Sequence, residues 1–188
     1  MNKFISSEIL EHIALSKELE SLNSHIYDAS KLIIDSIDSG GKVILFGNGG
    51  SAADAQHIAA ELVGRYKIER RGLPAISLST DTSAITSIGN DFGFEKIFER
   101  QLESLLNEND IVIGISTSGN SRNVLNAINY AVKRNIKSIC LLGGNGGKLK
   151  DICMIPIVIP SSNTPRIQEM HIFIGHTICG IIDNYFSS

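Results

Sequence analysis

The sequence contains no tryptophan, and aromatic residues make up only 6% of the chain. Such a composition provides few flat rings on which nucleotide bases could stack. The formal net charge is −3 and the isoelectric point is near 5.9, which argues against a broad basic surface. We therefore expect no nucleic acid among the partners of this protein.

Cysteine is also scarce. The chain has three cysteines, an odd number, and they are widely spaced at positions 140, 153 and 179. No Cys-x-x-Cys pair and no zinc-finger spacing occurs, so the sequence predicts neither a disulfide scaffold nor a cysteine-based metal site. Reduced and mostly buried thiols are typical of a cytoplasmic protein.

No long apolar run is present either. The first 20 residues mix acidic residues with isoleucine and leucine and lack the apolar core of a signal peptide. The longest apolar stretch, 172–182, is interrupted by His176 and is too short to span a bilayer. We expect a soluble cytoplasmic protein with no membrane partner.

Short apolar runs alternate with amphipathic segments from residue 41 onward. They predict strands at 42–47, 74–79, 110–115, 138–143 and 154–159, and helices at about 51–65, 83–88, 94–107 and 120–135. Such alternation is typical of βαβ units, so we expect a doubly wound, flavodoxin-like sheet of five parallel strands with helices on both faces.

Helical periodicity predicts further helices at both ends of the chain. Two amphipathic helices are expected within residues 2–39, and one long helix from about 165 to 186. The 188 residues are enough for one domain with a sizeable core. We therefore expect a single α/β domain, divided into N-terminal helices (1–40), a core (41–160) and a C-terminal helix (161–188).

The first strand leads into a glycine-rich loop, Gly47-Asn48-Gly49-Gly50, and then into a helix that we expect Ser51 to cap. Backbone N–H groups at such a turn favour an anion. The pattern Gly47-x-Gly49-x-x-Ala52 also fits a relaxed dinucleotide fingerprint, but no acidic residue ends the next strand at the required distance. An anion site is therefore the preferred interpretation.

A second loop of this kind follows the third strand. Residues 116–121 carry four hydroxyl groups and one glycine, but no lysine or arginine. Hydroxyls, backbone N–H groups and a helix N-terminus are together able to hold a phosphate, whereas the simpler interpretation is a serine-rich turn. Two hydroxyl-bearing helix starts, after two different strands, favour the phosphate site.

Polar pairs interrupt the apolar faces of two expected helices. His57 and Glu61 are four residues apart and therefore share one face, and Gln168 and His176, eight apart, lie roughly on one side. Burial of such groups is costly unless they satisfy one another, a metal or a substrate. Asn90 and Asp91 lie between turn-forming glycines, where either sugar binding or a simple Asx turn explains them.

Taken together, these segments resemble the phosphoheptose isomerases of the sugar-isomerase (SIS) domain family, also called GmhA. The resemblance covers nearly the whole chain. It rests on the motifs Gly47-Asn-Gly-Gly-Ser-Ala-Ala-Asp-Ala-Gln-His57-x-Ala-Ala-Glu61-Leu-x-Gly-Arg65, Gly89-Asn-Asp-Phe-Gly, Gly114-Ile-Ser-Thr-Ser-Gly-Asn-Ser121 and Arg166-Ile-Gln-Glu-x-His171.

The resemblance implies the SIS fold and an aldose–ketose isomerase. The implied reaction converts D-sedoheptulose 7-phosphate into D-glycero-D-manno-heptose 7-phosphate through an enediol, the first step toward activated heptose for lipopolysaccharide or capsule. It also implies a homotetramer with active sites between subunits and one Zn²⁺ per subunit.

The resemblance also implies roles for individual residues. Glu61 and His176 would be the acid/base pair, and His57, Glu61, Gln168 and His176 would hold the metal. The substrate would be bound by Asn48, Gly49, Gly50, Ser51, Glu61, Asn90, Asp91, Ser116, Thr117, Ser118, Ser121 and Gln168. Some relatives have an acidic residue where this chain has Pro165, so no catalytic role is assigned there.

One alternative belongs to a different functional class. DiaA, a non-catalytic SIS protein that binds the replication initiator DnaA, resembles the same family. In that group the positions that match Glu61 and His176 are usually not Glu and His. Because this chain has both residues, we favour the isomerase.

Overall fold

The computed structural model describes residues 2–187. The elements are α1 (Asn2–Glu18), η1 (Leu19–Leu22), α2 (Asn23–Asp38), β1 (Val43–Gly47), α3 (Gly50–Val63), β2 (Ala75–Ser77), α4 (Thr82–Phe92), η2 (Phe94–Lys96), α5 (Glu99–Leu105), β3 (Ile111–Ser116), α6 (Arg122–Lys133), β4 (Lys137–Gly143), η3 (Gly147–Asp151), β5 (Ile155–Ile159) and α7 (Thr164–Phe186).

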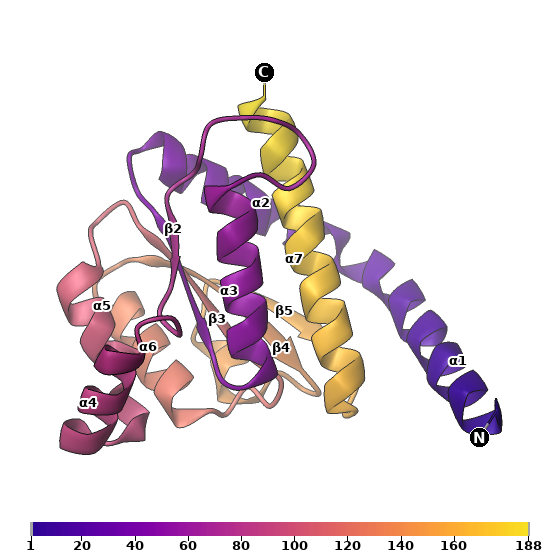
Figure 1. Ribbon diagram of the computed structural model, residues 1–188. Coiled ribbons are helices and arrows are strands. Elements are labelled where there is room, and N and C mark those ends of the chain that lie inside the picture. Colours follow the sequence, from indigo (N-terminus) through magenta and orange to yellow (C-terminus); the bar gives the residue numbers. More distant parts are fainter. Residues whose placement is uncertain (1, 188) are drawn as a thin grey trace.

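The five strands form one parallel sheet in the order β2-β1-β3-β4-β5. This is the doubly wound, flavodoxin-like order, so the predicted fold class is confirmed. In Figure 1, α3 and α7 lie side by side in front of the sheet, with α4, α5 and α6 on its other side. The order of the strands reverses at β1 and β3, which places the carboxyl ends of these two neighbours at the position where such sheets bind ligands.

Alternation along the strands divides the core into two layers. Val43 and Leu45 of β1 belong to the layer beneath α2, α3 and α7, whereas Ile44 and Phe46 face the layer beneath α5 and α6. Successive side chains of a strand point to opposite faces. Because helices cover both faces, the central strands β1, β3 and β4 are almost entirely buried and mostly apolar, and this is why the sequence predicts them well.

The bounds of several elements differ from those predicted. β2 has three residues because it is an edge strand that pairs only with β1. α4 continues to Phe92, so Asn90 and Asp91 lie in its last turn rather than in a loop before the next helix. The helix predicted at 94–107 is divided into η2 and α5. Gly93, at φ 90°, separates α4 from η2, because this backbone conformation cannot continue a helix.

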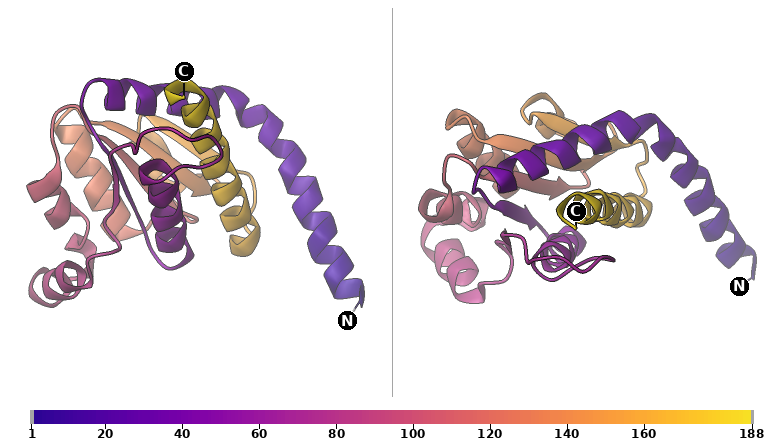
Figure 2. Two further views of the ribbon diagram at one scale, coloured as in Figure 1. Left: turned by 45° about the horizontal axis from the view of Figure 1, so that its top comes forward. Right: turned by 90° about the horizontal axis from the view of Figure 1, so that it is seen from above.

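The N-terminal helix α1 extends away from the rest of the molecule (Figures 1 and 2). One group of its apolar side chains is exposed: Phe4, Ile5, Ile9, Leu10 and Ile13. Several exposed apolar side chains on one helix favour an interaction site. Elsewhere the predictions for the cysteines are confirmed, since Cys140, Cys153 and Cys179 are unpaired and buried. No helix within residues 2–187 is long and apolar enough to cross a membrane.

His171 makes the stability of the fold depend on pH. It is fully buried on α7, its Nε2 lies 3.0 Å from the carbonyl oxygen of Leu142, and Nδ1 has no partner within residues 2–187. Burial lowers the pKa of His171 to about 4. A histidine in the unfolded chain has a pKa near 6.5, so below that pH the unfolded state binds a proton that the folded state does not.

We expect this difference to reduce the free energy of unfolding by about 3 kcal/mol between pH 7 and pH 4. Denaturant unfolding of the wild type and of His171→Gln, at fixed protein concentration, measures it: the variant should lack this part of the pH dependence. The control is His25→Gln on the exposed face of α2. Equal pH dependence in the wild type and His171→Gln would contradict the assignment.

Candidate functional site

Two loops meet at the carboxyl ends of β1 and β3, and a pair of asparagines joins them. Asn48 Nδ2 donates to Asn123 Oδ1 at 2.9 Å, and Asn123 Nδ2 donates to Asn48 Oδ1 at 2.8 Å. Asn123, at the start of α6, is buried and also accepts from its neighbour's backbone N–H. The predicted ligand Asn48 therefore also fixes the spacing between the two helix N-termini.

Hydroxyl groups line these helix N-termini. Ser51 and Ser116 are buried, and Ser116 Oγ lies 3.0 Å from Ser121 Oγ. Thr117 is half-buried and Ser118 is exposed. The loop is thus a neutral polar surface at the N-terminus of α6, as the sequence predicts, and such a surface favours an anion.

The prediction that Ser51 caps α3 is wrong. The helix begins at Gly50, and Gly49, at φ 55°, occupies the capping position. A glycine adopts this backbone conformation without steric cost, so the helix starts two residues earlier than it would with Ser51 as its cap. Ser51 remains in the first turn, where its hydroxyl is free of the capping role.

Close packing of α3 against α7 brings the remaining candidates together. A Cβ atom on Gly175 would lie 2.5 Å from Ile58 Cδ1, and one on Gly50 would lie 2.4 Å from Gln168 Nε2. The ends of the Ile58 and Gln168 side chains occupy the space beside these two glycines, so the two helices approach closely along this contact, which we call the seam. Gln168 therefore lies against the first turn of α3, next to the glycine-rich loop.

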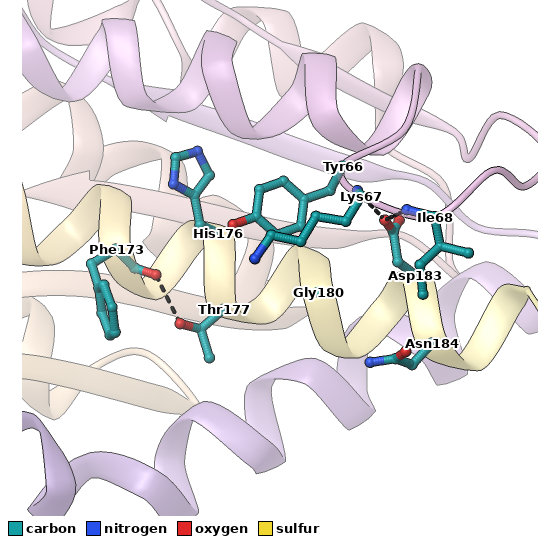
Figure 3. A pocket seen from close by; sticks show the side chains of 9 residues that line it. All are labelled: Tyr66, Lys67, Ile68, Phe173, His176, Thr177, Gly180, Asp183 and Asn184. Atoms are coloured by element: carbon teal, nitrogen blue, oxygen red, sulfur yellow. Dashed lines mark hydrogen bonds between the residues drawn. The ribbon is translucent and has the colours of Figure 1, made fainter.

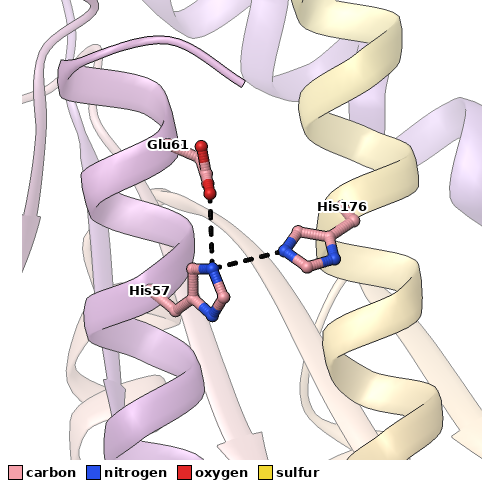
Figure 4. A group of neighbouring side chains, drawn as sticks. All are labelled: His57, Glu61 and His176. Carbon is pink, nitrogen blue, oxygen red and sulfur yellow. Dashed lines mark hydrogen bonds and ion pairs between the residues drawn. The ribbon is translucent and has the colours of Figure 1, made fainter. Parts of the chain in front are cut away.

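His57 and Glu61 of α3 face His176 of α7 across the seam (Figure 4). His57 Nε2 is 3.3 Å from Glu61 Oε1 and 3.4 Å from His176 Nε2. The rings of His57 and His176 meet edge to face, with centroids 4.9 Å apart. The four-residue spacing predicted the contact between His57 and Glu61. The prediction that His176 joins them came from the family resemblance.

Burial and neighbouring charges shift the pKa values of two groups here. Burial, followed by the nearby His57, lowers the pKa of His176, and Lys67 adds to this effect while Glu61 opposes it. Burial raises the pKa of Asp54 on α3 to about 6, against the opposing effect of His57. At neutral pH His176 is therefore an uncharged imidazole, able to accept or to donate a proton.

The donor set of this cluster fits a metal ion. One ligand atom each from His57, Glu61 and His176 lies within 4.8 Å of the other two. Two imidazole nitrogens only 3.4 Å apart must share a proton or a cation to avoid repulsion between their lone pairs. Imidazole nitrogens and a carboxylate oxygen are typical ligands of divalent transition metals.

Asn90 and Asp91 lie apart from this seam. Both are exposed in the last turn of α4, and Asn90 Nδ2 donates to Asp91 Oδ1 at 2.8 Å. Figures 1 and 2 place α4 far from the contact between α3 and α7. The expectation that they lie in a turn is therefore wrong, and the described chain does not bring them to the other candidates.

Sequence reasoning missed the segment that follows α3. Tyr66 and Lys67 line a cavity of about 400 Å³ beside His176 and Asp183 (Figure 3). The adjacency of Tyr66 to the Gly64-Arg65 end of the first motif was an available signal. A carboxylate at position 183, within the apolar C-terminal helix, was another.

Comparisons with known proteins place this geometry in context. A family model described as SIS domain matches residues 10–143. The phosphoheptose isomerase of a Nitratiruptor species is 59% identical over 187 residues, which is 99% of this chain and 100% of that protein. The phosphoheptose isomerase of Aliarcobacter butzleri is 54% identical over 188 residues, covering 100% of both.

Solved structures agree. Phosphoheptose isomerase GmhA from Neisseria gonorrhoeae superposes with a TM-score of 0.92 at 40% identity, covering 97% of this chain and 98% of that one. A phosphoheptose isomerase from Francisella tularensis gives 0.93 at 39% identity, covering 97% of each chain.

Proposed function

The chain belongs to the phosphoheptose isomerases of the SIS domain family, and from this we propose that it converts D-sedoheptulose 7-phosphate into D-glycero-D-manno-heptose 7-phosphate. The observation that carries the proposal is that Glu61 and His176, from two helices, meet in one cluster, while hydroxyl groups line the N-termini of α3 and α6. The Glu61–His176 cluster suits the transfer of protons to and from a carbon atom and its neighbouring oxygens. The hydroxyl-lined helix N-termini suit a phosphate.

The substrate phosphate is held by neutral groups. Ser51, Ser116, Thr117, Ser118 and Ser121 provide hydroxyls, and the first turns of α3 and α6 provide N–H groups and positive helix dipoles. Asn48, Gly49 and Gly50 form the floor of the pocket, and Gln168 lies against Gly50 from α7. The sugar chain then extends from the phosphate toward Glu61.

Glu61 and His176 divide the proton transfers. In the ketose-to-aldose direction the Glu61 carboxylate removes a proton from C1 and later delivers a proton to C2. The neutral imidazole of His176 accepts the proton of the C1 hydroxyl and donates one to the C2 oxygen. Protons removed and returned balance, so the two groups end in their initial states and no redox cofactor is consumed.

We propose Zn²⁺ as the ion held by His57, Glu61 and His176, with Gln168 as a fourth ligand from the same seam. When bound, zinc would supply Lewis-acid stabilisation of the developing oxyanion. A carboxylate that ligates zinc is a weaker base than a free one. The two roles of Glu61 are therefore separable by measuring turnover and metal content in the same variants.

Two residues require a second subunit in this account. Asn90 and Asp91, exposed on α4 away from the seam, are proposed to bind sugar hydroxyls in the site of a neighbouring chain. The exposed apolar side chains of α1 support a homo-oligomer, and we propose a homotetramer with active sites between subunits. We also propose that the whole chain forms one SIS domain and acts in the cytoplasm.

The DiaA-type alternative has no supporting observation. Glu61 and His176 are both present and lie in one cluster, whereas a binding module has no need of that chemistry. The similar proteins reported above are phosphoheptose isomerases.

Purified protein supplied with zinc should convert sedoheptulose 7-phosphate to an aldoheptose phosphate, and Glu61→Gln should reduce kcat by about 10²- to 10⁴-fold. Glutamine keeps the shape of the side chain but removes the base. Glu69→Gln, in an exposed position after α3, is the matched control and should turn over normally. No turnover by the wild type, or a near-normal rate for Glu61→Gln, would overturn the proposal.

Equilibrium dialysis of chelator-treated protein against Zn²⁺ should give one ion per subunit. His57→Ala and His176→Ala each remove one nitrogen ligand and should reduce the affinity for Zn²⁺ at least about tenfold. Even the loss of a residue that only hydrogen-bonds to a metal ligand reduces metal affinity by about that factor. His25→Ala on α2 should bind as the wild type does. Full activity of protein that contains no zinc would end the metal assignment.

A further inference from the structure

A buried ion pair fixes the segment that connects α3 to β2, residues 64–74, which we call the strap. Asp183 of α7 is fully buried and accepts from Arg70 Nε at 2.7 Å, and from the backbone N–H groups of Lys67 at 2.7 Å and Ile68 at 3.0 Å. Burial acts to raise the pKa of Asp183, but these hydrogen bonds and the Arg70 charge outweigh it, and the pKa is lowered. The carboxylate is therefore charged and fully bonded.

The same arginine ties the strap to the end of α3. Arg70 Nη2 donates to the carbonyl oxygen of Glu61 at 2.9 Å, and Nη1 donates to that of Leu62 at 2.9 Å. A cation at a helix C-terminus satisfies carbonyl groups that lack helical partners. Arg70 thus links the backbone of the proposed base to α7, the helix that carries His176.

The strap places the ring of Tyr66 beside that of His176 (Figure 3). The two rings are nearly parallel, at 15°, with centroids 5.1 Å apart. A Cβ atom on Gly180, one turn further along α7, would lie 3.6 Å from Tyr66 Cε1, so the ring packs along the helix surface. Lys67 Nζ lies 4.9 Å from the centre of the Tyr66 ring.

We propose that Tyr66 is a positioning residue for His176, and that the Arg70–Asp183 pair holds Tyr66 in place. This inference rests on the proposed function. The His57 ring lies at a steep angle to that of His176, and the Tyr66 ring lies nearly parallel to it in an offset stack, so the two neighbours restrict the plane of the imidazole. Proton transfer requires the acid/base group within about 10–20° of its productive orientation. The contact uses the face of the tyrosine ring, and its hydroxyl is not required.

The first experiment compares Tyr66→Leu with Tyr66→Phe by steady-state kinetics. Leucine removes the flat ring, and kcat should fall about 10- to 100-fold, because a small misplacement of a catalytic group costs up to about 10²-fold. KM should stay within about twofold, since the phosphate contacts are unchanged. Phenylalanine keeps the ring, so both constants should match the wild type.

The matched control is Tyr130→Leu. Tyr130 lies on α6 and also has a cation over its ring, since Arg134 Cζ is 4.0 Å from the ring centroid. Its loss should leave kcat and KM unchanged. This control thereby distinguishes the general effect of removing an aromatic ring from the specific effect of losing the contact with His176.

A second readout does not depend on turnover. In protein labelled with ¹³C at histidine Cε1, the His176 signal, assigned by its absence in His176→Asn, should carry the ring-current shift of Tyr66. The shift should persist in Tyr66→Phe and disappear in Tyr66→Leu. Asp183→Asn, which weakens the anchor, should reduce both the shift and kcat.

The proposal is overturned if Tyr66→Leu keeps the wild-type kcat and His176 signal, or if Tyr66→Phe loses as much kcat as Tyr66→Leu. If the wild type does not isomerise sedoheptulose 7-phosphate, the proposed function fails. The His176 signal in Tyr66→Leu then decides the positioning claim alone, since an unchanged signal rejects the stacked contact.

Discussion

The close approach of α3 and α7 is the constraint on which the rest of the site depends. Neither helix carries the chemistry alone: His57 and Glu61 belong to α3, and His176 to α7. Their ligand atoms meet because Gly50 and Gly175 leave no side chain between the helices. A methyl group at Gly175 would require the Ile58 side chain to shift, and any separation of the helices would move the three groups apart.

The same seam explains how a chain with few cations near its pocket can bind a phosphorylated sugar. In the site we propose, the charge of the substrate would meet helix N-termini and hydroxyls at the ends of β1 and β3, and the reacting carbons would extend toward the α3–α7 cluster. The Asn48–Asn123 pair fixes the first region, and the Arg70–Asp183 pair fixes the second. The hydrogen-bonding groups of both pairs have partners, and buried polar networks of this kind specify a unique geometry.

The sequence predicted correctly those features that depend on residues close together in the chain. The apolar runs gave the positions of the five strands, most accurately for β1, β3 and β4, which are buried on both faces. The spacing of His57 and Glu61 placed them on one face. Two predictions at glycines were wrong. Gly49, not Ser51, occupies the N-cap position of α3, and α4 continues through Gly89 to include Asn90 and Asp91. Tyr66 was missed because its partner lies on the last helix, so its role exists only after folding.

Isomerisation in D₂O tests the central claim, that Glu61 moves a carbon-bound proton through an enediol, most directly. After the sugars reach equilibrium over wild-type enzyme, we expect solvent deuterium at C1 of the ketose phosphate and at C2 of the aldose phosphate, detected by NMR. Glu61→Gln should introduce almost none in the same time. Equilibration over many turnovers of the wild type with no deuterium in either sugar would contradict the account, because a proton held on a carboxyl group would exchange in part with solvent.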